Sequence, residues 1–268
     1  MLWAAMTWLL ALKLAATPVT VGLASLAGRR WGPGVSGWIA GIPLTSGPLA
    51  VYLALEQGAA FAAVAAAGIL TGLIAVAAFC LVYGRLAVRL PWSLALTAAL
   101  AAFGAITIFL RSGPFVLPVT AAAVAAAIVL ALTLLPRSAG GTARQAAPTW
   151  DIPVRMLVAT AIVVGLTAIA PLLGARLAGL LAPVPVYAGL MTVFAHRLDG
   201  GSSAVEVLRG VLYGAFGFGA FFAGLAATLT VAGIPAAVLV ALALGLTTQV
   251  TTLWLLSRLA GAAAAAEA

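Results

Sequence analysis

The feature of this chain that most restricts its fold is an almost unbroken succession of long apolar stretches. A helix that crosses the hydrocarbon core of a bilayer needs roughly 20 apolar residues. Apolar residues make up 65% of the 268 positions and charged residues only 7%, whereas soluble domains carry about 25% charged residues. The sequence therefore predicts an all-α integral membrane protein with hardly any water-soluble part.

The breaks between the apolar stretches fall at Gly, Pro and Arg, and they divide the chain into about nine transmembrane helices. We expect these spans near residues 8–28, 36–56, 59–83, 91–110, 115–136, 153–175, 182–198, 203–230 and 235–257.

The basic residues indicate how the chain is oriented. They stand singly between apolar runs and form no patch, which argues against a nucleic-acid partner despite a net charge of +8. Alternating loops place ten of the 13 on one side: Arg29, Arg30, Arg85, Arg89, Arg137, Arg144, Arg155, Arg197, Arg209 and Arg258. Lys13, Arg111 and Arg176 fall on the other. Because excess Lys and Arg mark the cytoplasmic side, we expect a multi-pass protein of the bacterial cytoplasmic (inner) membrane, with its N-terminus outside and its C-terminus cytoplasmic.

The chain also contains an internal repeat, which aligns residues 7–83 with residues 149–225 without gaps. The first window holds ten glycines and the second eleven, and six of them align where chance would align between one and two. Lys13 aligns with Arg155, and Pro43 aligns with Pro185. Since helix propensity does not favour glycine, its recurrence points to shared backbone or close-packing requirements.

The repeat groups the spans as four, one and four. We expect a first four-helix repeat over residues 1–113, a linking transmembrane helix and cytoplasmic loop over 114–148, a second four-helix repeat over 149–260, and an Ala-rich tail over 261–268. One linking span makes the second repeat enter the membrane from the opposite side. Such inverted repeats are typical of secondary transporters.

One part of the second repeat, residues 185–222, has a recognisable pattern. It consists of an apolar helix ending in Ala195–His196, a turn at Gly200, then Leu208–Arg209 and Phe221–Phe222. This stretch resembles the GlpM-type bacterial inner-membrane proteins, which are short four-span chains associated with glycerol-metabolism regulons. The resemblance implies two GlpM-like units fused through one linking helix, and it leaves the substrate open.

Residues 39–58 of the first repeat look similar but depart from that pattern. Ala54 stands where His196 does, and Ala67 stands where Arg209 does. The match is therefore better in the second repeat than in the first.

Two Gly- and Pro-rich interruptions lie at matching places in the two repeats, and they are the candidate substrate pathway. Proline removes a backbone donor and disturbs the preceding turn, so both helices should be broken or kinked there. Interrupted segments at corresponding positions are the best sequence pointer to a transporter's binding site. Packing kinks without function are the alternative. The candidate residues are Pro43, Thr45, Ser46, Gly47, Pro185, Tyr187, Gly189 and Thr192.

A few ionisable groups are further candidates. His196 and Glu56 close the two interrupted helices, and a histidine can titrate near neutral pH, which would allow proton or ion coupling. Solvated helix ends are the alternative. Lys13 and Arg155 form a pair of equivalent cations, whose chains could instead reach the headgroups. The run Thr247–Thr252 is unusually polar for an apolar helix and suits either interhelical hydrogen bonds or a pathway.

The sequence offers little for catalysis. It has no HExxH, phosphate-binding glycine loop or GxSxG motif, and it holds one histidine, one cysteine and five acidic residues. We therefore expect no enzyme, no metal site and no cofactor. The leading hypothesis is a transporter or permease for a small solute in the lipid bilayer, and a homodimer is compatible with it. The alternative is a non-transporting structural or accessory subunit of an envelope-synthesis complex.

Overall fold

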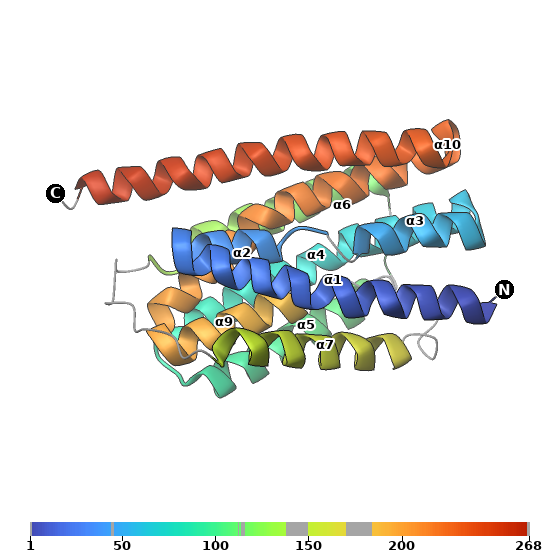
Figure 1. Ribbon diagram of the computed structural model, residues 1–268. Helices are drawn as coiled ribbons and strands as arrows, with labels where there is room; N and C mark the ends of the chain where they lie inside the picture. The colour runs from blue at the N-terminus through green and yellow to red at the C-terminus, as the bar shows by residue number, and fades with distance from the viewer. Residues whose placement is uncertain are drawn as a thin grey trace.

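The computed structural model describes residues 2–43, 46–111, 113, 116–137, 150–169 and 184–266, and within these ranges all regular secondary structure is helical (Figure 1). The helices are α1 (Leu2–Trp31), α2 (Pro33–Ala40), α3 (Ser46–Gln57), α4 (Ala59–Ala87), α5 (Trp92–Leu110), α6 (Leu117–Leu134), α7 (Asp151–Ile169), α9 (Val186–Asp199) and α10 (Gly201–Ala266).

These bounds differ from the expected spans in two informative places. The expected span 36–56 is two helices, because α2 ends before the Gly41–Pro43 segment and α3 begins after it. The expected spans 203–230 and 235–257 both lie in α10, which is interrupted at Gly233 (φ 76°, ψ 167°) just before Pro235. The chain folds back there, so α10 has a first arm (residues 201–232) and a second arm (residues 234–266) (Figure 1).

Several helices are suited to a membrane. Among the described residues, four helical segments are long and apolar enough to cross one: Ala59–Ala87, Trp92–Leu110, Leu117–Leu134 and Gly201–Leu255. The first is mostly buried inside the bundle, whereas few residues are buried in the other two single helices and in the most apolar stretch of Gly201–Leu255. Large apolar side chains stand on this outer surface, with Val231 81% and Phe109 79% exposed. An apolar outer surface of this kind suits contact with lipid better than contact with water.

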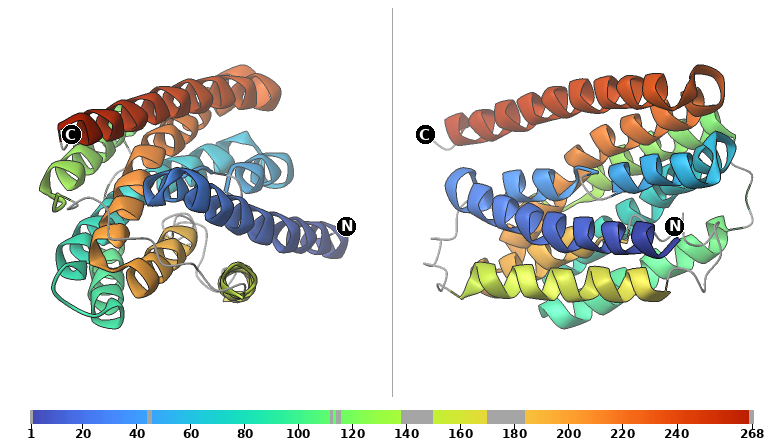
Figure 2. Two further views of the ribbon diagram at one scale, coloured as in Figure 1. Left: turned by 60° about the vertical axis from the view of Figure 1, so that its left-hand side comes forward. Right: turned by 45° about the vertical axis from the view of Figure 1, so that its right-hand side comes forward.

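The core lies between α4 and the first arm of α10, which run antiparallel. Gly84 of α4 lies beside Leu208 near the start of α10, and Leu73 lies beside Gly219 further along it. The largest fully buried side chains come mainly from these two helices: Ile69, Leu70, Phe79, Tyr83, Leu208, Leu212, Phe222, Leu225 and Leu229. The other helices surround this pair (Figure 2).

Helix α2 approaches the first arm of α10 through small residues. Gly37 of α2 lies against Val207 and Val211 of α10, and Gly41, the C-cap of α2, lies against Gly214. Gly37 and Gly41 have the GxxxG spacing, as do Gly210 and Gly214 of α10. A Cβ atom at Gly37 would overlap the carbonyl of Val207, so a side chain at this position would separate the helices. Small residues at such an interface let membrane helices approach to backbone contact.

Two turns share one backbone geometry. Gly58 precedes α4 with φ 88° and ψ 161°, and Gly200 precedes α10 with φ 88° and ψ 178°. This region is open essentially to glycine alone. Each glycine lets the chain turn sharply between two helices.

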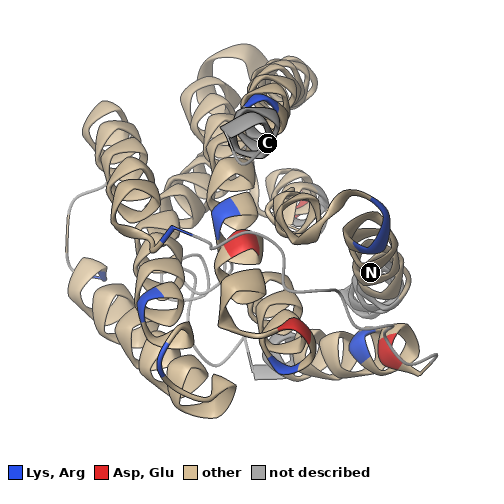
Figure 3. Ribbon diagram, turned by 90° about the vertical axis from the view of Figure 1, so that its left-hand side faces the viewer, with Lys and Arg blue, Asp and Glu red and all other residues tan. Residues whose placement is uncertain are grey.

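One end of the bundle collects most of the charged residues, and we call it the basic end (Figure 3). Side-chain contacts between helix ends show which helices begin or end there. Arg29 at the end of α1 pairs with Asp151 at the start of α7. Arg197 at the end of α9 lies over the ring of Trp92 at the start of α5, with 5.6 Å between the guanidinium carbon and the ring centroid.

Helix α6 is capped at the basic end by two arginines. Nε of Arg85, on α4, donates to the Leu134 carbonyl across 2.8 Å. Nη2 of Arg209, on α10, donates to the Pro136 carbonyl across 3.0 Å. The last carbonyls of a helix have no partner inside it, and the first bond satisfies that of Leu134, the last residue of α6. The second holds Pro136, two residues beyond the helix, so the two bonds fix this end of α6 to α4 and α10.

Candidate functional site

A buried carboxylate at the basic end holds two arginines. Asp151 is 1% exposed, and its Oδ2 accepts from Nη2 of Arg29 at 3.3 Å while its Oδ1 accepts from Nε of Arg155 at 2.9 Å. Asp151 is the first residue of α7, where the helix dipole favours a negative charge. Arg155 follows four residues later on the same face. We call Arg29, Asp151 and Arg155 the ion cluster.

The rest of the Arg155 side chain is enclosed by helix α9. Its guanidinium lies over the ring of Phe194, 4.6 Å from the centroid. Its Nη1 lies 3.6 Å from the sulfur of Met191, which also accepts a hydrogen bond from the Ser25 hydroxyl at 3.7 Å. Thioether sulfur is a weak acceptor, so the carboxylate of Asp151 is the strong anchor of this cation.

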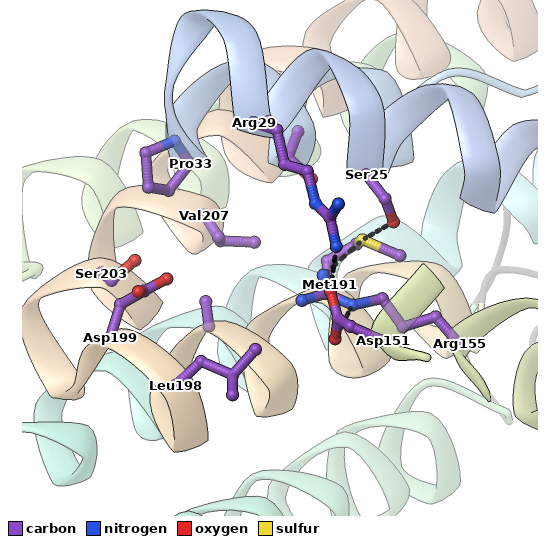
Figure 4. Close-up of a pocket in the computed structure, with 13 residues that line it drawn as sticks. Ser25, Arg29, Pro33, Asp151, Arg155, Met191, Leu198, Asp199, Ser203 and Val207 are labelled. Atoms are coloured by element: carbon purple, nitrogen blue, oxygen red, sulfur yellow. Dashed lines mark hydrogen bonds and ion pairs between the residues drawn. The ribbon is translucent and has the colours of Figure 1, made fainter. Parts of the chain in front are cut away.

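The ion cluster forms one wall of a cavity of about 50 Å³. A cavity needs roughly 10–15 Å³ on this measure to hold one water, so this one has room for several. Asp199 and Ser203 lie on the side opposite the Arg29–Asp151 contact (Figure 4). The other lining residues come from α1, α2, α9 and α10: Ser25, Gly28, Pro33, Ser36, Met191, Ala195, Leu198 and Val207.

One polar group in this cavity has no hydrogen-bond partner within the described part of the chain. The side chain of Ser203 is 7% exposed, and its hydroxyl makes no hydrogen bond to any described residue. Leaving a buried hydroxyl unsatisfied costs about 1–3 kcal/mol. A water or a bound polar group in the cavity would remove that penalty.

None of the described residues of the two predicted interruptions lines the cavity. Thr45 falls outside the described residues, while Pro43 precedes α3 and Ser46 begins it, buried. A Cβ built on Gly47 would lie 3.4 Å from Cζ of Phe221 on α10.

In the second half, Pro185 is the N-cap of α9. A Cβ built on Gly189 would lie 3.5 Å from Cζ of Phe79 on α4. The two candidate glycines therefore pack against phenylalanines of different helices, and the described contacts bring each stretch to the opposite half of the chain.

Tyr187 and Thr192 line the inner face of α9. The hydroxyl of Tyr187 lies 3.1 Å from the Thr17 hydroxyl, which joins α9 to the buried middle of α1. The Thr192 hydroxyl donates to the Ala188 carbonyl at 2.7 Å, and its side chain is fully buried. Of these two pathway candidates, Tyr187 is the one whose hydroxyl reaches another helix.

The two residues proposed for proton or ion coupling lie at opposite ends of the bundle. Nδ1 of His196 lies 3.3 Å from the hydroxyl of buried Tyr83, near the basic end. Glu56 is exposed near the end of α3, just before the Gly58 turn. The structure therefore does not bring the two together.

Of the two predicted cations, Lys13 and Arg155, only Arg155 has a described side chain. Lys13 lies in α1, but its side chain falls outside the described part of the chain, whereas Arg155 belongs to the ion cluster. Sequence reasoning missed Asp151, Arg29 and Ser203. The available signal was the spacing of four residues between Asp151 and Arg155, in a chain with only five acidic residues.

No protein-family model, curated protein or solved structure matches this chain. Its function is therefore inferred from its own residues and their contacts.

Proposed function

We propose that this chain is a transporter or permease for a small solute, built from two inverted four-helix repeats in a bacterial cytoplasmic membrane. The carrying observation is the cavity walled by Arg29, Asp151 and Arg155, between α1 and α2 of the first half and α7, α9 and α10 of the second. Ionisable groups within membrane helices are costly, and they face the bundle interior or a water-filled cavity along solute and ion pathways.

Matching helix boundaries support the repeat. Helix α3 ends at Gln57 and α9 ends at Asp199, and these two positions are equivalent in the repeat alignment. The glycine turn and the start of the next helix follow in the same register, since Gly58 corresponds to Gly200 and both have φ 88°. The alignment found from glycines in the sequence thus also relates two turns of the same backbone geometry.

Reciprocal contacts between the halves support it further. Gly47 lies against Phe221, and Gly189 lies against Phe79. Gly47 and Gly189 are equivalent in the repeat alignment, as are Phe79 and Phe221. A two-fold relation between the halves produces this pattern, because residue i of one half then meets residue j of the other and j meets i.

The directions of equivalent helices support an inverted relation. The end of α1 meets the start of α7 at the Arg29–Asp151 contact, and Gly22 lies beside Met156 further along the two helices. Helices α4 and α10 are likewise antiparallel. Two halves related by a two-fold axis in the membrane plane would cross in this way.

We place the basic end in the cytoplasm because of its excess of arginine. Aromatic side chains accompany this charge, as at a membrane–water interface. Arg197 lies over Trp92, and Arg258 lies over the ring of Trp254 at 4.5 Å from the centroid. In this orientation the cavity lies near the cytoplasmic end of the bundle, and Tyr187 and Thr17 lie deeper, along the proposed pathway.

Flux through the purified protein in liposomes tests the proposal. Stopped-flow light scattering would follow glycerol, glycine, sodium lactate and potassium chloride, which sample a polyol, a zwitterion, an anion and a cation. We expect one class to enter faster than in protein-free liposomes. Tyr187→Phe should slow that solute, because it removes the hydroxyl that meets Thr17.

The matched control is Thr97→Val on α5, where an exposed hydroxyl bonds only to its own helix. Its flux should equal that of the unmodified protein. Absence of flux for all four classes would favour the structural or accessory subunit. Unchanged flux in Tyr187→Phe and Ser46→Ala would remove those residues from the pathway.

A further inference from the structure

We infer that the Arg29–Asp151 ion pair is a reversible latch, which closes the solute pathway at the basic end and seals the cavity behind it. This inference rests on the proposed transport function and names the element that regulates access to it. The pair joins the end of α1 to the start of α7, and thus one half of the chain to the other. Few contacts are better placed to report whether the halves are together at this end.

The geometry of the ion cluster keeps the free-energy cost of opening this latch small. Arg155 holds Asp151 from within α7 at 2.9 Å, whereas Arg29 reaches it from α1 at 3.3 Å. When α1 moves away, Asp151 keeps its partner on its own helix. A buried charge left without a partner is strongly destabilising, and Arg155 prevents that outcome.

The other partner is equally suited to release. The side chain of Arg29 is 39% exposed, while that of Asp151 is 2% exposed. An arginine at the rim of the cavity can exchange its carboxylate for water without a large desolvation penalty. The fixed half of the latch is therefore buried, and the mobile half already borders solvent.

The sequence of the repeat provides no equivalent latch at the opposite end. In the repeat alignment, Leu9 corresponds to Asp151 and Pro171 corresponds to Arg29, while Lys13 corresponds to Arg155. Leucine and proline side chains cannot form an ion pair. The repeat thus supplies the two residues of this ion pair at the basic end and not at the equivalent positions of the alignment.

The unpartnered hydroxyl of Ser203 marks the space that the latch covers. It lies across the cavity from the Arg29–Asp151 contact and is 7% exposed (Figure 4). A residue at this position should gain access to bulk water when the latch opens. Ser203 is therefore the natural position for a reporter.

Thiol accessibility in the full-length protein tests the latch. Cys80 is the only cysteine and is buried, so Cys80→Ala gives a background without thiols. Ser203→Cys then places a thiol of similar size in the cavity. A membrane-impermeant maleimide, applied to inside-out or right-side-out vesicles, reports its exposure to each side.

Adding Arg29→Gln should raise labelling from the basic side about two- to fivefold, the shift expected for loss of a partly exposed ion pair. Arg29→Lys keeps the charge and should label at the parent rate. Arg30→Gln is the matched control, because Arg30 stacks on Trp31 at 5.4 Å and not on Asp151.

Equal labelling with and without Arg29→Gln would overturn the latch, as would an equal rise in Arg30→Gln or a rise from the opposite side. Size-exclusion profiles establish that each variant is folded. The labelling needs no solute, so the two proposals fail separately. If solute flux is observed but Arg29→Gln leaves labelling unchanged, the latch alone is wrong. If Arg29→Gln alters labelling but no solute is transported, the transport function alone is wrong.

Discussion

The indole N–H of Trp38 donates to the hydroxyl of Thr252 across 3.3 Å and so joins α2 to the second arm of α10. The Thr252 hydroxyl in turn lies 3.0 Å from the Gln249 carbonyl. Beside this contact the Gln249 side chain is 6% exposed and packed against Gly217, and neither of its amide atoms has a partner among the described residues. Satisfied and unsatisfied polar groups therefore occur within one turn of the same helix.

The first prediction separates these two groups. Gln249→Met, which keeps the length of the side chain, should raise stability by about 1 kcal/mol or leave it unchanged, because it removes unsatisfied amide atoms. Thr252→Val should lower stability by about 1–3 kcal/mol, because it leaves the Trp38 donor without its acceptor. Thermal unfolding in detergent can be followed through reaction of Cys80, which is buried in the folded protein. A loss of stability in Gln249→Met would indicate that the amide has a partner in the membrane.

The second prediction concerns the glycine contact between α2 and α10. Gly37→Ala and Gly210→Ala should each lower stability by about 1–3 kcal/mol, because the added Cβ meets backbone atoms that cannot move aside. Gly104→Ala is the matched control, since no neighbouring atom lies within 4 Å of its Cβ position. That control should be neutral or stabilising by up to about 1 kcal/mol, the usual helix preference for alanine. The same thermal measurement compares the three.

The third prediction treats the two glycine turns as equivalent. Alanine at Gly58 or Gly200 has ample room, yet both positions have φ 88°, so each substitution should cost about 1–3 kcal/mol through backbone strain alone. Gly165→Ala, in the interior of α7 with open space around it, is the control and should not destabilise. Urea or thermal unfolding of the three variants checks this, and a neutral result at either turn would contradict the backbone geometry.

The fourth prediction uses the reciprocal glycine–phenylalanine contacts. Gly47→Ala and Gly189→Ala should both be tolerated, because the new methyl would stand at ordinary contact distance from Phe221 or Phe79. Gly47→Leu should destabilise by about 1–3 kcal/mol through overpacking. In the double variant, the leucine at position 47 should fill part of the space left by Phe221→Ala. Its loss of stability should therefore be smaller than the sum of the losses of the two single variants. A double-mutant cycle measures this coupling, and strictly additive effects would show that the pair does not interact.

Much of the fold could be predicted from local sequence. The turn at Gly58 and the break beside Pro43 follow from glycine and proline, whose backbone effects are local. The apolar runs indicate helices but not their neighbours, so the central position of α4 was not predictable. That α4 is buried and α5 exposed depends on which faces meet in three dimensions, and both helices read as equally apolar.

The candidate site was less accessible to sequence reasoning. Arg155 was identified through its alignment with Lys13, but its partner Asp151 sits at the edge of a polar loop and reads as a solvated helix start. Arg29 lies 122 residues earlier and contributes only through tertiary contact. Ser203 gives no sequence signal, because an unpartnered hydroxyl can be identified only when its surroundings are known.

The capping of α6 by Arg85 and Arg209 has a mechanical consequence. These two bonds attach one end of α6 to both halves, and α6 lies across the bundle from α1 and α7 (Figure 2, left). If one half rotates against the other, this end of α6 would then act as the pivot. A rotation of given angle would move α1 and α7 apart by more than it moves α4 and α10, because displacement grows with distance from the pivot.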